Sequence, residues 1–206
     1  MTTGTDSISF VRQFWAGLRV LLVLTVLLGV AYPLAVTGVS QLLFRWQAQG
    51  SLVDASGERV TDADEAVGSL LIGQSFDGPQ WFHPRPSAAG DGYDTLASAG
   101  SNLGPLNPDL VATIEERRAA VADEEGVAPT DVPADALTAS ASGLDPDISP
   151  AYAELQVARV AAERGLDEQE VRTLVDQTTV GRDLGVLGEP RVNVLRLNLA
   201  LETMSS

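Results

Sequence analysis

The first residues in this chain that could act together chemically are a pair of carboxylates in the sequence LDPD, residues 144–147. Asp145 and Asp147 stand two residues apart. Such a pair could bind a cation or divide the roles of general acid and general base. The same four residues also make an ordinary turn, in which aspartate side chains accept backbone N–H groups. The sequence favours the turn.

Other constellations typical of enzymes are missing from the sequence. His83 is the only histidine and there is no cysteine, so we expect no metal site and interpret His83 as a structural residue. The P-loop motif does not occur. Ser87, Ser101 and Ser142 lack both a nucleophile elbow and a suitable His–Asp pair. We therefore expect no catalytic residue in this chain.

The charge of the chain is strongly negative after its apolar N-terminal part. Aspartate and glutamate number 28, the 13 basic residues are all arginine, and the net charge is −15. From residue 46 onward 27 acids face ten arginines, which leaves −17. Such a surface repels nucleic acid, so we expect no nucleic-acid partner. It indicates either solubility in a salty medium or, as a separate hypothesis, enrichment of potassium ions near an entrance.

A transmembrane helix is predicted over residues 14–46. Its core, residues 20–44, carries no charge and is long enough to cross a bilayer. A cleaved signal peptide is disfavoured, because its apolar stretch covers only about 7 to 15 residues. Pro33, preceded by Tyr32, removes one helical hydrogen bond. We expect a bend there and a neighbouring helix that helps to satisfy the freed carbonyl.

The predicted topology is a single pass through the cell membrane. Two arginines before the apolar core are nearly matched by two after it, so the charge bias is weak. The first flank is short and lacks acids next to the span, whereas the C-terminal part is long and acidic. We therefore predict a cytoplasmic N-terminus at residues 1–13 and an extracytoplasmic soluble domain at residues 47–206.

The predicted fold class is α+β, one N-terminal transmembrane helix followed by a small soluble α+β domain. Residues 47–66 are interpreted as a linker and 67–73 as a short strand. Residues 74–107 are crowded with Gly, Pro, Ser and Asp, which is typical of disorder. Their aromatic residues instead predict an ordered loop packed on a core or a partner.

Three amphipathic helices and a strand are predicted beyond that loop. Each helix starts at a polar cap, namely Asn107 before Pro108, Ser149 before Pro150, and Asp167 in a capping box with Glu170. Gly126 and Gly165 are predicted to end the first two helices. Residues 191–201 alternate leucine with polar residues, which predicts a strand.

Five unusual strings follow one another along the chain: 72–76 (IGQSF), 81–88 (WFHPRPSA), 100–108 (GSNLGPLNP), 137–146 (LTASASGLDP) and 188–195 (GEPRVNVL). Together, and in this order, they resemble the C subunit of the bacterial Kdp potassium-importing P-type ATPase. The resemblance covers residues 14–201. It implies a non-catalytic accessory subunit of a high-affinity ATP-driven potassium import complex, needed for assembly and stability. Asp147 stands where the family often has histidine.

The resemblance also implies partners and contact residues. The partners are a potassium-channel-like subunit, a phosphorylated ATPase subunit and a small single-span subunit, all within the lipid bilayer. The family is described as a catalytic chaperone that raises the ATP affinity of the ATPase subunit, so ATP is an implied ligand. The implied nucleotide contacts are Ser140, Ser142 and Gly143. The implied partner contacts are Tyr32, Pro33, Phe82, Arg85, Asn102, Asn107 and Asp145.

The predicted topology favours the implied role in assembly over the implied contact with ATP. ATP is cytoplasmic, whereas residues 140–143 are predicted to lie outside, so we favour assembly and capping of the channel-like subunit over direct nucleotide contact. An alternative that the residues leave open is a membrane-tethered extracellular ligand-binding domain or enzyme acting alone.

Overall fold

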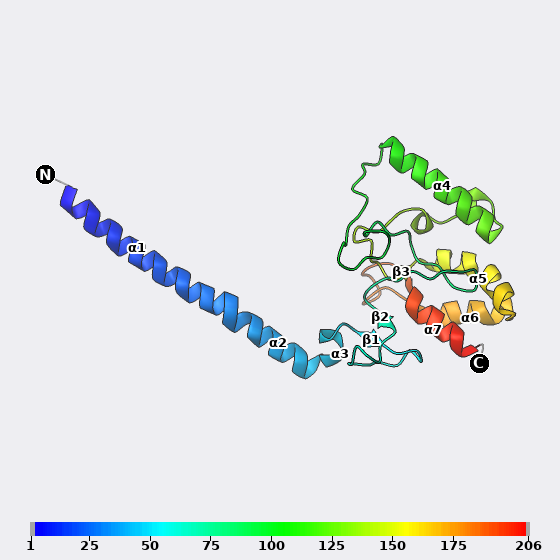
Figure 1. The fold of residues 1–206 in the computed structure, drawn as a ribbon, viewed down its shortest axis with the longest axis horizontal. Coiled ribbons are helices and arrows are strands. Elements are labelled where there is room, and N and C mark those ends of the chain that lie inside the picture. Colours follow the sequence, from blue (N-terminus) through cyan, green and yellow to red (C-terminus); the bar gives the residue numbers. More distant parts are fainter. Residues whose placement is uncertain (1–2, 205–206) are drawn as a thin grey trace. The chain divides into compact units, whose positions relative to one another are not determined.

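The computed structural model describes the backbone of residues 3–204 and the side chains of residues 10–204. The first two residues of the predicted cytoplasmic segment therefore lie outside the described part. The chain forms two compact units that divide between residues 49 and 50. One long apolar helix is followed by a small domain of helices and two small sheets, which confirms the predicted α+β class (Figure 1).

The first unit is a long helix with one widened turn. Its elements are α1 (Thr3–Val26), the π turn η1 (Leu27–Ala31), α2 (Tyr32–Leu43) and the short α3 (Arg45–Ala48). By length and composition, Phe10–Leu43 could cross a membrane, with a mean hydropathy of 2.4. The Tyr32 N–H bonds to the Leu27 carbonyl, five residues back, directly before Pro33. The helix therefore contains a π turn directly before Pro33, while the bend expected there stays a prediction.

Two small antiparallel sheets organise the second unit. In the first, β1 (Leu52–Val53) pairs with β2 (Gly68–Ser69), placing Leu52 opposite Ser69. In the second, the order is β3 (Asp147–Ile148), β5 (Arg191–Asn193), β4 (Thr179–Val180). In that sheet Val192 lies opposite both Ile148 and Thr179. The helices are α4 (Pro108–Glu125), α5 (Pro150–Arg164), α6 (Glu168–Thr178) and α7 (Val194–Met204), with short 3-10 turns η2 (Pro129–Asp131) and η3 (Ala134–Ala136).

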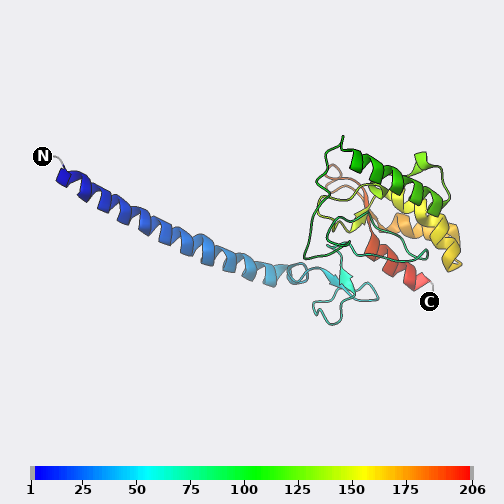
Figure 2. The same cartoon turned by 45° about the horizontal axis from the view of Figure 1, so that its top comes forward.

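The core lies among the last three helices. In Figure 1, α5, α6 and α7 lie side by side, and α4 lies alongside α5 at the edge of this group, as Figure 2 also shows. The apolar side chains between them are fully or almost fully buried; they include Val157, Val160, Val171, Val175, Leu197 and Leu201. Of α4 only Ala122 is buried, so this helix contributes one edge of the core rather than its centre.

The three predicted helix starts are confirmed by their caps. Asn107 accepts a hydrogen bond from Asp109 N, and Ser149 accepts one from Tyr152 N. Asp167 accepts from the backbone of both Gln169 and Glu170. Gly126 and Gly165 end α4 and α5, each with φ of 65°, a left-handed conformation that glycine adopts at little cost.

The prediction of a strand over 191–201 is wrong after residue 193. The buried residues of α7 are Val194, Leu195, Leu197, Asn198 and Leu201. Those at 194, 197, 198 and 201 have the i, i+3, i+4, i+7 spacing of one helix face. Asn193 Oδ1 accepts the N–H of Arg196 at 3.1 Å, as a helix cap does. The alternating leucines therefore belong to a helix capped by Asn193 and not to a strand.

The predicted strand over 67–73 and the predicted linker over 47–66 differ in extent from the observed elements. The strand expected over 67–73 is only β2, because turns follow it directly. The predicted linker 47–66 contains β1, and its first two residues belong to α3.

Residues 74–107 consist of turns and irregular backbone and are held by side-chain amides. Phe82 is fully buried. Its N–H donates to Asn198 Oδ1 at 2.9 Å, and Asn198 Nδ2 donates to its carbonyl at 3.0 Å. Gln156 makes the same two hydrogen bonds with His83. Its Oε1 accepts the His83 N–H at 2.6 Å, and its Nε2 donates to the His83 carbonyl at 3.1 Å. Each amide thus supplies the donor and acceptor that a neighbouring strand would supply. We call Gln156 and Asn198 the amide clamp.

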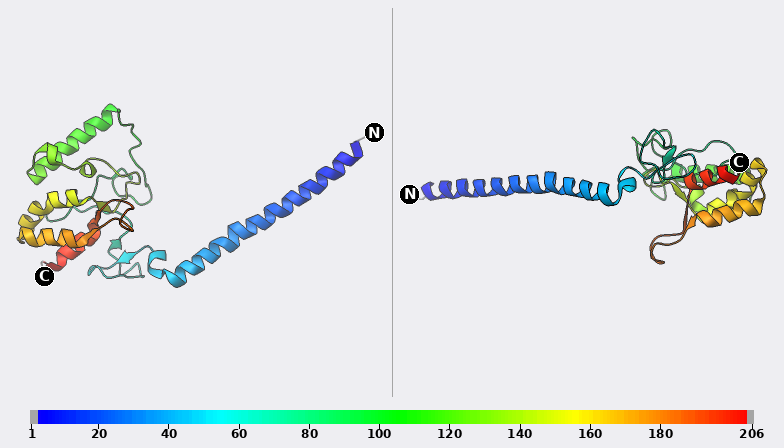
Figure 3. Two further views of the ribbon diagram at one scale, coloured as in Figure 1. Left: turned by 180° about the vertical axis from the view of Figure 1, so that it is seen from behind. Right: turned by 90° about the horizontal axis from the view of Figure 1, so that it is seen from below.

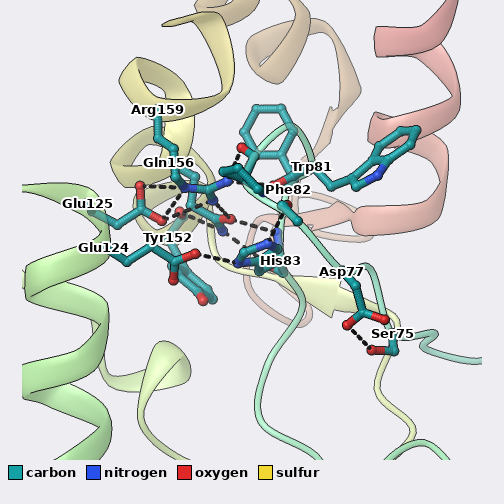
Figure 4. Close-up of polar contacts among 12 residues, drawn as sticks. Ser75, Asp77, Trp81, Phe82, His83, Glu124, Glu125, Tyr152, Gln156 and Arg159 are labelled. Carbon is teal, nitrogen blue, oxygen red and sulfur yellow. Dashed lines mark hydrogen bonds and ion pairs between the residues drawn. The ribbon is translucent and has the colours of Figure 1, made fainter. Parts of the chain in front are cut away.

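A buried ion pair lies beside the amide clamp (Figure 4). The side chains of Arg159 and Glu125 are 7% and 2% exposed, and the two groups meet at 3.0 Å. Arg159 also donates to the carbonyls of Pro79 and Trp81 at 2.5 and 2.9 Å. Burial raises the pKa of Glu125, and the arginine opposes that rise. The pair therefore ties the loop to α4 and α5.

Replacing a clamp residue tests this account of the loop. Asn198→Leu keeps a similar volume but leaves the buried N–H and carbonyl of Phe82 without partners. We expect the free energy of unfolding to fall by about 2 to 5 kcal/mol, since each unsatisfied buried group costs roughly 1 to 3 kcal/mol. Urea unfolding of the full chain in detergent, followed by near-ultraviolet circular dichroism, measures this. The exposed Gln177→Leu is the control, expected within about 0.5 kcal/mol of the parent.

Candidate functional site

The segment 137–146 is a hub to which distant parts of the domain are fastened. Its carbonyl oxygens accept from both sides: Gly143 from Ser87 Oγ at 2.6 Å, Leu144 from Gly73 N at 2.9 Å, and Pro146 from Val194 N at 3.0 Å. Ser98 Oγ donates to the Ser142 carbonyl at 2.9 Å. The segment itself is irregular, so these side chains and loop amides take the place of a strand ladder.

An open groove of about 490 Å³ lies along one side of the hub. Its lining comes from the loop, η3, the hub, β3 with the residue after it, the segment before β5 and the first residue of β5. The lining residues are Arg85, Ala134, Asp135, Asp145, Asp147, Ile148, Ser149, Gly188, Glu189, Pro190 and Arg191. Two arginines thus face four carboxylates, and the groove carries a net negative charge.

Two ion pairs lie in the groove. Arg85 meets Asp145 at 2.9 Å and donates a second hydrogen bond to the Thr138 carbonyl at 3.3 Å. Arg191 meets Asp147 at 3.3 Å. These side chains remain between 24% and 39% exposed, so they are open to solvent along one edge. Such half-exposed pairs can exchange partners with polar groups of another molecule.

Asp145 and Asp147 form a turn, as the sequence favoured. Asp145 Oδ1 accepts the N–H of Asp147 at 3.1 Å. Burial raises the pKa of Asp147, and a hydrogen bond from Asn193 at 3.1 Å opposes that rise. Within the described residues no group of three or more His, Asp or Glu side chains is placed to hold a metal ion.

Two residues that hold Arg85 were not identified from the sequence. The Tyr93 hydroxyl donates to the Arg85 carbonyl, and burial raises the pKa of this tyrosine, which keeps the donor proton in place. Ser87 Oγ accepts the Tyr93 N–H at 2.8 Å while it donates to the hub. Ser87 belongs to the string 81–88 and Tyr93 is an aromatic residue of the loop, but neither feature indicates that the two residues hold Arg85.

The three implied nucleotide contacts lie together on the hub. Ser140 is 9% exposed, and its hydroxyl lies 3.4 Å from that of Ser142, which is exposed. Gly143 has φ of 67°, and a Cβ there would lie 2.6 Å from the Ala99 carbonyl oxygen. Only glycine fits this close approach of two backbones. Gly143 therefore has a packing role of its own.

The implied partner contacts are scattered in the structure. Arg85 and Asp145 meet in the groove. Phe82 is 0% exposed and belongs to the core, so its side chain has no surface to offer another subunit in this structure. Asn102 lies in an exposed loop with φ of 53°, and Asn107 caps α4. Tyr32 and Pro33 begin α2 in the other unit.

His83 makes structural contacts on both ring nitrogens. Nδ1 lies 3.3 Å from Glu124 Oε1, and Nε2 lies 3.0 Å from the Gly78 carbonyl oxygen. Figure 4 shows the ring between the loop and α4. These contacts agree with the structural interpretation of this histidine.

The fold and the groove together define a membrane protein with one candidate span and a small acidic domain whose groove holds two ion pairs. Comparison with known proteins gives the family. The model of the K+-transporting ATPase c chain, KdpC, matches residues 14–203. The chain belongs to this family.

Relatives agree along almost the whole length of the chain. A potassium-transporting ATPase KdpC subunit from Kineococcus radiotolerans is 58% identical over 95% of this chain and 95% of its own. The subunit of that name from Beijerinckia indica is 54% identical over 88% of this chain and 89% of its own. That from Mycobacterium tuberculosis is 51% identical, covering 94% and 99%.

The raised pKa of Asp147 predicts a pH dependence of stability. A carboxyl whose pKa is raised by folding contributes stability below its unfolded pKa, and this contribution is lost as pH rises through its folded pKa. Asp147→Asn removes that titration. We therefore expect the variant to gain stability relative to the parent as pH rises from about 4 to neutral, measured by urea unfolding of the full chain.

The control for this experiment is Asp91→Asn, on an exposed part of the loop. The attraction of Arg191 lowers the pKa of Asp147, but burial outweighs it, so the ion pair is already included in the expected direction. A stability difference that stays constant over this pH range, or that favours the parent increasingly as pH rises, would contradict the account of a carboxyl penalised by burial.

Proposed function

We propose that this chain is a non-catalytic accessory subunit of an ATP-driven potassium import complex, and that it acts by holding the complex together. One observation carries the proposal: the hub is one of the five strings that carry the family resemblance, and the other four converge on it. Gly73, Ser87 and Val194 each bond to it directly. At Gly100 a Cβ would lie 3.0 Å from the carbonyl oxygen of Ala141.

The converging strings support a role in binding because three of them also line the groove at the surface. Arg85, Asp145 and residues 188–191, from three of the strings, line the groove. Half-exposed ion pairs of this kind contribute little to the stability of the domain itself, typically about 0 to 1 kcal/mol. At an interface they select the partner and its orientation. The groove is therefore the part of the domain that we assign to another subunit.

We further propose that the domain lies outside the cytoplasm and caps the potassium-channel-like subunit. The short first flank and the long acidic domain support this orientation. The membrane-spanning helix packs, in this proposal, among the spans of the other subunits, where a neighbour can complete the hydrogen bonding around the π turn before Pro33. The remaining partners would be the phosphorylated ATPase subunit and the small single-span subunit.

In this proposal any rise in the ATP affinity of the ATPase subunit comes through assembly. ATP is cytoplasmic, whereas residues 140–143 lie in the domain that we place outside. The carbonyls of Ser142 and Gly143 also accept hydrogen bonds from Ser98 and Ser87 of the same domain. These internal bonds support a structural role for the segment in place of a nucleotide contact.

Purifying the complex with and without this chain tests the proposal. Without it we expect the other subunits to separate in mild detergent and potassium-stimulated ATPase activity to fall at least tenfold, because the contacts that hold the subunits in register are lost. Supplying the full chain from a plasmid is the control and restores both. Intact assembly with undiminished activity in its absence would refute the proposal.

The alternative, a tethered ligand-binding domain or enzyme acting alone, draws support from the size of the groove. Pockets of about 300 to 1,000 Å³ are typical of small-molecule sites. The same purification decides between the two, since a chain acting alone would be recovered without larger membrane partners.

A further inference from the structure

Residues 181–190, which join β4 to β5, form a projecting arm. All ten residues are exposed, in contrast to Val192 in β5, which is fully buried. Figure 3 shows the segment extending away from the helices of the domain. We call residues 181–190 the arm.

The arm is braced from within. Asp183 and Leu187 form an antiparallel bridge with two hydrogen bonds of 2.9 Å. Arg182 forms an ion pair with Glu189 at 2.6 Å, and in the sequence these two residues lie between the bridge and the flanking strands. Arg191 in β5 reaches Asp183 at 3.7 Å, which links the arm to the sheet. A segment held in one conformation loses little freedom when it binds, so the arm is organised for docking.

The tip of the arm presents apolar side chains to solvent. Leu184, Val186 and Leu187 are 90%, 74% and 57% exposed. Leu184 has φ of 53°, a left-handed conformation that leucine rarely adopts. A strained backbone that turns a leucine outward gives the domain no packing of its own. Such a feature at a surface points to a function in binding.

The arm is continuous with the groove. Gly188, Glu189 and Pro190 at its base line the groove together with Arg85 and Asp145. An occupant of the groove that extends past Pro190 would meet the apolar tip. An apolar contact flanked by polar pairs is the usual anatomy of a protein interface.

The charge of the domain identifies the kind of occupant. From residue 46 onward the chain carries −17, and the arm itself holds two acids and one arginine. Surfaces that dock on anionic lipid are basic, so a bilayer surface does not suit this arm. A protein pocket that is apolar at its centre and polar or basic at its rim does suit it.

We propose that the arm is a docking element that inserts Leu184, Val186 and Leu187 into an apolar pocket on the extracytoplasmic face of another subunit. This inference rests on the proposed function, because it takes that subunit from the same complex. The groove then supplies the polar rim of the same interface.

Site-specific photo-crosslinking in the membranes of cells that express the whole complex tests the proposal. A photoreactive phenylalanine analogue replaces Leu184 in the full chain. The equally exposed Leu96, in the loop and 96% exposed, is the matched control position. We expect a crosslink from position 184 to another subunit of the complex and at least tenfold less from position 96. Crosslinks from 184 to lipid alone, or equal yields from both positions, would overturn the proposal.

A pair of serine variants provides a second readout. Leu184→Ser with Leu187→Ser should lower the recovery of partner subunits at least tenfold, whereas Leu96→Ser with Leu106→Ser should leave it unchanged. The urea midpoint of the arm variant should match the parent, because both side chains are exposed. Partner recovery at the parent level would overturn the arm proposal. The proposed function would survive that result as long as omitting the whole chain still dissociates the complex.

Discussion

The domain depends on one constraint, which is that buried irregular backbone must find hydrogen-bond partners without a strand ladder. Two irregular segments face each other, the loop 74–107 and the hub 137–146, and side chains from elsewhere satisfy them. Asn198 and Gln156 each bond to both the N–H and the carbonyl of one loop residue. Because unsatisfied groups are costly, these few side chains determine where the loop lies. The groove exists because the loop is fixed in this way.

The elements that the sequence predicted well are those that depend on local chemistry. Caps at Asn107, Ser149 and Asp167 and glycines at the helix ends act within one turn of the chain, and the apolar span is set by composition. The helix α7 was missed because its leucines also fit a period of two. The cap at Asn193 would have corrected this, since its side chain bonds to the N–H three residues later.

The candidate site could be predicted only in part, since its geometry is set by contacts distant in the chain. Asp145 and Asp147 were recognised as a turn. Their arginine partners, Arg85 and Arg191, lie 60 and 44 residues away along the chain, and no local pattern joins them. The resemblance supplied Arg85 and Asp145 but placed Phe82 beside them, where burial assigns it to the core. The family motifs thus indicate which segments form the hub and its contacts, but they do not show which of their residues are buried and which lie at the surface.

In the proposed function the hub, the groove and the arm form one extracytoplasmic surface that binds partner subunits, so the side of the membrane on which the domain lies is its central claim. The chain has no cysteine, so any introduced cysteine is unique. Ala120→Cys, at an exposed position of α4, can be treated in intact cells with a membrane-impermeant maleimide, with Gln13→Cys in the first flank as its counterpart. The account predicts labelling of position 120 in intact cells and of position 13 only after lysis. Labelling of position 13 in intact cells, with position 120 protected until lysis, would contradict it.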